Sequence, residues 1–278
     1  METSNNARKF SIVNKETGEI IRELKDGDKI ISKKQSEAYK SKAEPDNRHF
    51  AFGKMKRMKE ISQKLDAKKC GYIMRLIPYM QCGTGYLIKE EGSVMKTKTD
   101  LAKGLGVSKV SSRNNIIDAL MDASALELDE IGYKINPDVH ISGTITGNEL
   151  IKLFKTTLDK LANDLKPAEL GYLYKVLPYV HYQTNLICID PFESDPANFK
   201  FLNQKEVAEV IGIDVDNARK FLNKCHKKRI LFEGSTSDRR EKQYYVNPYI
   251  FYRKKGYPDD TLKSMFLSSP YSPKKNTR

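Results

Sequence analysis

The sequence predicts a mainly helical α+β protein in which one kind of domain is encoded twice. Gly, Tyr, Pro and Tyr occur at the same spacing in residues 71–80 and again in residues 171–180. In both stretches the apolar residues follow the i, i+3, i+4, i+7 spacing of one buried helical face. The same order of landmarks continues through roughly 80 residues in each copy, which indicates an internal duplication.

Length and charge limit the classes of function. A chain of 278 residues has room for about two domains of ordinary size. Lys and Arg exceed Asp and Glu by a formal net charge of +13, which favours a polyanionic partner, nucleic acid before a membrane surface. The alternative is a lysine-rich surface that serves solubility alone.

Cysteine usage and hydropathy predict a cytoplasmic protein. The chain has four cysteines and no Cys-x-x-Cys pair, so the usual spacing of zinc ligands is absent. We interpret Cys70 and Cys225 as core residues. No run of residues is apolar enough for a signal peptide or a membrane span.

The N-terminal part predicts a β-hairpin followed by a basic linker, together residues 1–49. Short apolar runs flank a turn in which Gly18 can adopt the positive φ that a tight hairpin needs. Packing and partner contact are equally good explanations of this element. We expect one domain over 50–143, a second over 148–256, and a basic flexible tail over 257–278.

Within each repeat, two helices joined by a glycine-containing turn follow the Pro-Tyr motif. In repeat one the turn contains Gly106 and the second helix is predicted over 109–123. In repeat two the turn contains Gly212 and the second helix is predicted over 215–228. This is the helix-turn-helix pattern, whose second helix can enter the DNA major groove. Two apolar strands follow in each copy and predict a wing, so we interpret each repeat as a winged helix-turn-helix domain.

The end of repeat two carries a family resemblance. The residues Asn247-Pro248-Tyr249-Ile250-Phe251 resemble the Asn-Pro-x-x-Phe ending of RepL-type replication proteins of Gram-positive plasmids. The opening at 14–20 is similar to that of such mobile-element proteins, and the resemblance covers mainly 168–252. The tandem plan is also similar to theta-type plasmid initiators, whose two halves each grip DNA. Repeat one departs from the pattern, because it ends Asn136-Pro137-Asp138-Val139-His140 without the aromatic residue.

Candidate DNA-contacting residues lie near the start of the second helix of each pair, at positions that we expect to be exposed. In repeat one they are Lys109, Ser111, Ser112, Arg113 and Asn115, and in repeat two Asn217, Arg219, Lys220 and Lys224. Arg113 aligns with Arg219, so we expect both helices to present an arginine. Arginine can bond guanine in a bidentate manner that is worth ~1–3 kcal/mol of discrimination; contact with phosphate or solvent alone is the alternative.

The two predicted wings differ in charge. Wing two carries the basic residues Arg239, Arg240 and Lys242, and wing one carries the acidic residues Glu127, Asp129 and Glu130. Acidic groups beside phosphates are unfavourable. We therefore expect repeat two to bind DNA with helix and wing, and repeat one to dock by its helix alone or to mediate self-association.

Signatures of catalysis are missing from the sequence. None of the four histidines belongs to a His-x-His pair, and there is neither a phosphate-binding loop nor a serine nucleophile elbow. We predict a protein that is not an enzyme and has no cofactor, no catalytic residues and no metal site.

The predicted function is sequence-specific binding of double-stranded DNA, and the resemblance implies a replication initiator-like protein of a phage or plasmid. Host replication or transcription proteins are possible partners, and the chain is expected to be a monomer or a homodimer. One alternative is a transcriptional repressor that binds operators. A second alternative is a protein-interaction module that reuses winged helices.

Overall fold

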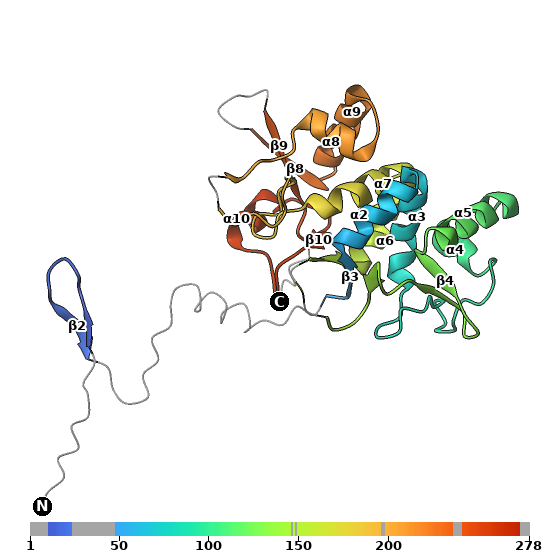
Figure 1. Ribbon diagram of the computed structural model, residues 1–278, viewed down its shortest axis with the longest axis horizontal. Coiled ribbons are helices and arrows are strands. Elements are labelled where there is room, and N and C mark those ends of the chain that lie inside the picture. Colours follow the sequence, from blue (N-terminus) through green and yellow to red (C-terminus); the bar gives the residue numbers. More distant parts are fainter. Residues whose placement is uncertain are drawn as a thin grey trace, which may run out of the picture. The chain divides into compact units, whose positions relative to one another are not determined.

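The computed structural model describes residues 11–23, 48–145, 147, 149–195, 198–235 and 241–272 (Figure 1). The chain divides into two compact units, Met1–Pro45 and Asp46–Arg278. In the first unit, β1 (Ser11–Val13) pairs antiparallel with β2 (Ile20–Glu23). Gly18, with φ of 72°, takes the turn, which confirms the predicted hairpin. The predicted basic linker falls mostly on residues 24–47, which lie outside the described residues.

The second unit contains both repeats and is built from helices and sheets, so the chain belongs to the predicted α+β class. Equivalent elements follow one another in the same order in the two repeats. Repeat one contains β3 (Phe50–Lys54), α2 (Met55–Lys64), α3 (Ala67–Leu76), the 3-10 helix η1 (Ile77–Tyr79), α4 (Leu101–Leu105), α5 (Val110–Asp122), β4 (Leu126–Leu128), β5 (Tyr133–Ile135) and β6 (His140–Ile141). Repeat two contains β7 (Leu150–Phe154), α6 (Lys155–Asp164), α7 (Pro167–Val176), η2 (Leu177–Tyr179), α8 (Gln204–Ile211), α9 (Val215–Lys227), β8 (Leu231–Ser235), β9 (Lys242–Val246) and β10 (Phe251–Tyr252), followed by α10 (Asp260–Met265).

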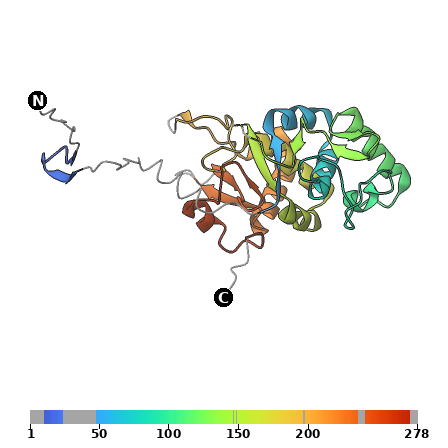
Figure 2. The same cartoon turned by 90° about the horizontal axis from the view of Figure 1, so that it is seen from below.

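The two repeats share a four-stranded antiparallel sheet with the order β10-β7-β3-β6. Phe52 of β3 lies opposite Lys152 of β7, and the register is reciprocal on either side of that pair. The outer strands follow the same symmetry, because β6 pairs with β3 in repeat one and β10 pairs with β7 in repeat two. Equivalent strands that pair antiparallel in this way are related by a two-fold axis. The repeats are therefore two halves of one unit, which Figure 2 shows in blue to green and in yellow to red.

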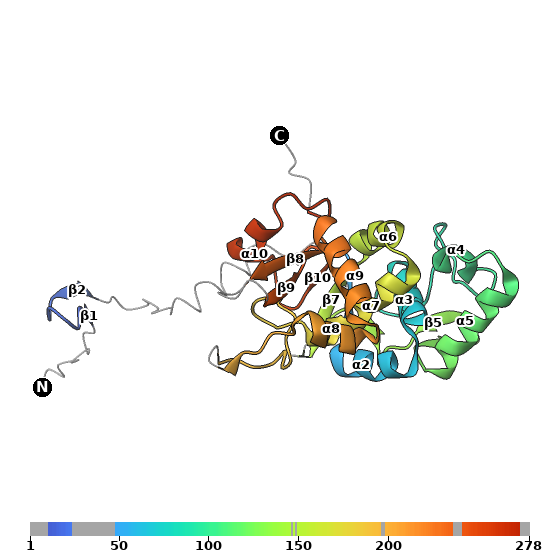
Figure 3. The same ribbon diagram turned by 90° about the horizontal axis from the view of Figure 1, so that it is seen from above.

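The Gly-Tyr helices of the two repeats, α3 and α7, pack against each other in the middle of this unit (Figure 3). A Cβ atom added at Gly71 would lie 1.7 Å from the carbonyl oxygen of Pro167, and one at Gly171 would lie 1.5 Å from that of Ala67. Only glycine allows the two backbones to come this close. The repeated glycines therefore lie at the closest approach of these two helices, and the buried apolar residues of both repeats form one core.

Local sequence signals explain where the helices end. Gly106 and Gly212 adopt left-handed conformations, with φ of 66° and 76°, at the ends of α4 and α8. Pro78 and Pro178 follow α3 and α7 and lie in η1 and η2, because proline cannot continue the α-helical hydrogen bonding. None of the described helices has the length and apolar character to cross a membrane.

The first part of the predicted flexible tail, residues 257–272, is folded against the protein, which contradicts that prediction. Residues 257–272 include α10 and pack on repeat two, with Phe266 and Tyr271 almost completely buried. The tail prediction was made from charge and from the Ser and Pro content. It missed the apolar area that Leu262, Phe266 and Tyr271 remove from water. Cys70 and Cys225 are fully buried, as predicted for core residues.

Candidate nucleic-acid interface

Helix α9 is fixed by its apolar side and leaves a polar side exposed. Its N-cap Asp214 accepts a hydrogen bond from the backbone N–H of Asn217, which satisfies one of the free donors of the first turn. The side chains that face the core are Ala218, Phe221, Leu222 and Cys225. The predicted residues Asn217, Arg219 and Lys220 lie outside this buried side, and all three are exposed.

A row of basic side chains runs along α9. Four lysines and one asparagine border a shallow hollow on its surface: Lys220, Asn223, Lys224, Lys227 and Lys228. Their spacing of three and four residues places them on one side of the helix. Arg219, which directly precedes Lys220, forms an exposed ion pair with Asp216 at 2.9 Å. An exposed pair of this kind is weak, so a phosphate or a base edge can compete for the guanidinium.

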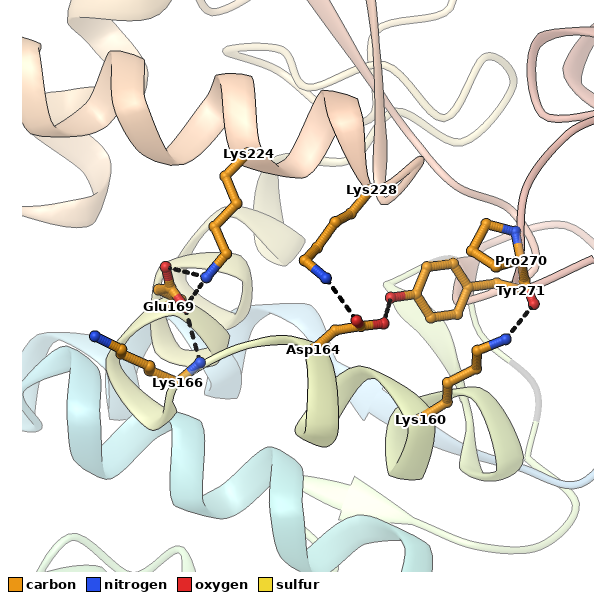
Figure 4. Close-up of polar contacts among 8 residues, drawn as sticks. All are labelled: Lys160, Asp164, Lys166, Glu169, Lys224, Lys228, Pro270 and Tyr271. Carbon is orange, nitrogen blue, oxygen red and sulfur yellow. Dashed lines mark hydrogen bonds and ion pairs between the residues drawn. The ribbon is translucent and has the colours of Figure 1, made fainter.

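Two lysines of this row are held by carboxylates of the same repeat (Figure 4). The ammonium group of Lys224 lies 2.7 Å from both carboxylate oxygens of Glu169, in the first turn of α7. The ammonium group of Lys228 lies 2.7 Å from Asp164, the last residue of α6. The ammonium group of Lys224, a predicted DNA-contacting residue, is therefore already paired with a carboxylate of the protein.

Asp164 receives a second hydrogen bond from the C-terminal segment. The hydroxyl group of Tyr271 donates to its other carboxylate oxygen at 2.6 Å. Burial acts to raise the pKa of Asp164, but the hydrogen bonds from Lys228 and Tyr271 outweigh that effect. The pKa of this carboxyl therefore lies below its usual range, and the group carries a negative charge at neutral pH.

In repeat one, the position of Arg113 contradicts the prediction of an exposed arginine on α5. Only 7% of Arg113 is exposed, and its guanidinium donates to the hydroxyl oxygen of Thr99 at 3.4 Å. Three residues separate Gly106 from the start of α5, whereas two separate Gly212 from the start of α9. The extra residue turns α5 by about 100° relative to the predicted alignment.

The buried positions give the correct alignment of the two helices. In α5 they are Arg113, Ile116, Ile117 and Leu120, and in α9 they are Ala218, Phe221, Leu222 and Cys225. Arg113 is thus equivalent to Ala218, and the residue equivalent to Arg219 is Asn114. The matching pair of presented arginines that the sequence predicted does not exist.

The exposed side of α5 is neutral to acidic. The predicted residues Lys109, Ser111 and Asn115 are exposed and Ser112 is partly exposed. Lys109 is the N-cap residue and precedes the helix. Within α5 itself, every residue of which is described, the exposed charged side chains are Asp118 and Asp122.

The two hairpins that the sequence predicted to be wings differ in charge in part as expected. In wing one, the hydroxyl of Tyr86 donates to Asp129 and, together with the ammonium group of Lys134, lowers the pKa of Asp129 to about 2. In wing two, Lys242 forms an ion pair with Glu233 at 2.8 Å, so its charge is shared with a carboxylate. Arg239 and Arg240 lie outside the described residues.

Several residues of this surface were not predicted. Asn223, Lys227 and Lys228 continue the row of α9, and a helical projection of the sequence from Lys220 onward would have found them. Glu169 and Asp164 could not be found in this way. They lie far from their partners in the sequence and meet them only through the packing of α6, α7 and α9.

Side chains that could form a metal site do not come together in the described part of the chain, where no three His, Cys, Asp or Glu residues form a suitable group. The comparisons with known proteins yield no match, whether with family models, with curated proteins or with solved structures.

Proposed function

We propose that the chain binds double-stranded DNA, that each repeat is a winged helix-turn-helix, and that repeat two makes the main contact. The observation that carries this proposal is the exposed side of α9. Arg219, Lys220 and Lys227 extend from a helix whose opposite side is anchored in the core. A helix presented in this way after a glycine turn suits the major groove.

The order and pairing of the elements support the winged-helix assignment. In repeat two, Leu186 forms an antiparallel bridge to Tyr245, so a third short extended segment lies beside the β8–β9 hairpin. In repeat one, Tyr86 forms the same bridge to Lys134 beside β4–β5. Helix, strand, two helices and a hairpin on that strand are the parts of a winged helix.

The two-fold relation between the repeats bears on the form of the DNA site. If both second helices contact one duplex, they meet half-sites in inverted orientation, because protein symmetry and site symmetry correspond. The neutral to acidic exposed side of α5 gives little attraction to phosphates. We therefore expect an asymmetric site, with one strong half-site for repeat two.

The direct test is a binding titration with a labelled duplex over a series of salt concentrations. Replacing Arg219 and Lys220 together by Ala should weaken binding. It should also reduce the slope of log Kobs against log salt by ~0.9 for each phosphate that the variant no longer neutralises. The matched control replaces Lys56 and Lys64, two exposed lysines of α2, by Ala. Equal weakening in both double variants would contradict the assignment of α9.

We propose replication initiation on a phage or plasmid as the biological role, on the strength of the resemblance at 247–251. Control of transcription is the alternative. Mapping the DNA bound by the chain in its host distinguishes them, because an initiator enriches a replication origin and a repressor enriches a promoter.

One observation favours a protein-interaction role for repeat one. Val110 at the start of α5 and Leu128 and Ile131 in wing one are about half exposed. They lie in the repeat whose second helix and wing expose mainly acidic groups. Apolar surface with acidic neighbours suits a protein partner better than DNA. If the mapping enriches no DNA at all, the whole chain is better assigned to this class.

A further inference from the structure

The ion pairs of Lys224 and Lys228 lie beside the proposed DNA-binding surface and are partly shielded from water. The side chains of Lys224 and Lys228 are 35% and 38% exposed, and those of Glu169 and Asp164 are 19% and 28% exposed. Each pair joins α9, or the residue just after it, to the α6–α7 corner of the same repeat (Figure 4). Shielding of this kind makes them more persistent than pairs on an open surface.

The same lysines share the hollow along α9 with Lys220 and Lys227. A phosphate that contacts Lys220 or Lys227 therefore lies next to Lys224 and Lys228. Lysine carries its charge on a flexible four-carbon chain and can change partners within that reach. The two carboxylates consequently compete with the DNA backbone for the two ammonium groups.

We propose that Glu169 and Asp164 limit the sequence-independent part of the affinity for DNA, because they withhold Lys224 and Lys228 from the phosphates of a bound duplex. This inference rests on the proposed DNA-binding function. Contacts to phosphate carry no information about base sequence, so withholding two of them lowers the affinity for every sequence alike. The base contacts from the first turns of α9 then supply a larger share of the binding free energy.

The C-terminal segment reinforces one of the two pairs. Tyr271 is buried and donates to the carboxylate oxygen of Asp164 that Lys228 does not use. Lys160 in turn donates to the carbonyl oxygen of Pro270 at 2.6 Å and ties this segment to α6. The segment that the sequence predicted to be a basic flexible tail therefore holds a carboxylate in place.

The test removes each carboxylate charge while keeping the shape of the side chain. Glu169→Gln keeps an oxygen that can accept the hydrogen bond from the backbone N–H of Lys166, so the start of α7 is preserved. Asp164→Asn is the second variant. Asp159→Asn, at an exposed carboxylate on α6, removes the same charge and is the control for long-range electrostatics. The full chain and each variant are titrated against a fluorescein-labelled duplex of mixed sequence at several salt concentrations, and their melting temperatures are recorded.

Glu169→Gln should bind the mixed-sequence duplex about two- to fivefold more tightly than Asp159→Asn does, which is the range expected for releasing one such pair. Its salt slope should be steeper by ~0.9, and Asp164→Asn should behave alike. The inference is overturned if the variants match the control, or if they bind more weakly at an unchanged melting temperature. If the wild-type chain itself binds no duplex, the proposed function falls, and this inference falls with it.

Discussion

Replacing Gly171 by Ala tests the packing that joins the two halves. The added Cβ would lie 1.5 Å from the carbonyl oxygen of Ala67, whereas ordinary contact begins at 3.4 Å. The atom in its way belongs to the backbone of α3 and cannot rotate aside. The two helices must therefore separate by roughly 2 Å, which loosens dispersion contacts along their shared core.

The expected cost follows from two opposing effects. Overpacking a core costs ~1–3 kcal/mol and occasionally more, and a clash with backbone belongs at the upper end. Alanine recovers up to ~1 kcal/mol of helix propensity relative to glycine. We expect Gly171→Ala to lower the free energy of unfolding by about 2 kcal/mol, or the melting temperature by about 4–8 °C.

The assay is urea unfolding followed by circular dichroism, with Gly104→Ala as the matched control. The atoms nearest to a Cβ at Gly104 in α4 belong to the side chains of Leu76 and Tyr79, at 3.2 Å or more, so this variant should stay within about 1 kcal/mol of wild type. Gly71→Ala forces the same separation of the helices, so the double variant should cost less than the sum of the single ones. If Gly171→Ala has the same free energy of unfolding as Gly104→Ala, the described contact between α3 and α7 is refuted.

Two further predictions concern buried titratable groups. Burial lowers the pKa of His140 to about 3, so between that value and its ordinary pKa the unfolded chain binds a proton that the folded chain does not. The free energy of unfolding should therefore fall by about 2 kcal/mol from pH 7 to pH 5. Replacing His140 by Phe, the residue at the equivalent position 251, should reduce this fall in denaturant titrations. Parallel pH profiles of the variant and the wild-type chain would contradict the prediction. Burial also raises the pKa values of Cys70 and Cys188 to about 12. A thiol reagent should therefore label the native chain rapidly only at the exposed Cys82. Rapid labelling of a second cysteine, detected by mass spectrometry, would contradict the described core.

The sequence by itself determined the features that depend on neighbouring residues. Apolar spacing located the second helix of each pair to within one residue at either end. Gly106 and Gly212 marked the turns between paired helices because few other residues adopt that backbone conformation. The hairpin at Gly18 and the order of paired helices and following hairpin in both repeats were also readable, but the four strands of the central sheet were not predicted. These signals are local, so each can be recognised without knowledge of what packs against it.

The tertiary structure decided everything that depends on which surfaces meet. The repeated Gly-Tyr motif was recognisable as a repeat, but only the packed molecule shows Gly71 and Gly171 at the contact between the halves. One residue more in a turn rotated α5 and buried Arg113, a change that an alignment of landmarks does not register. The contacts that hold Lys224, Lys228 and the C-terminal segment depend on the close approach of chain segments distant in sequence. Charge counts predict such groups as exposed, and packing places them against partners.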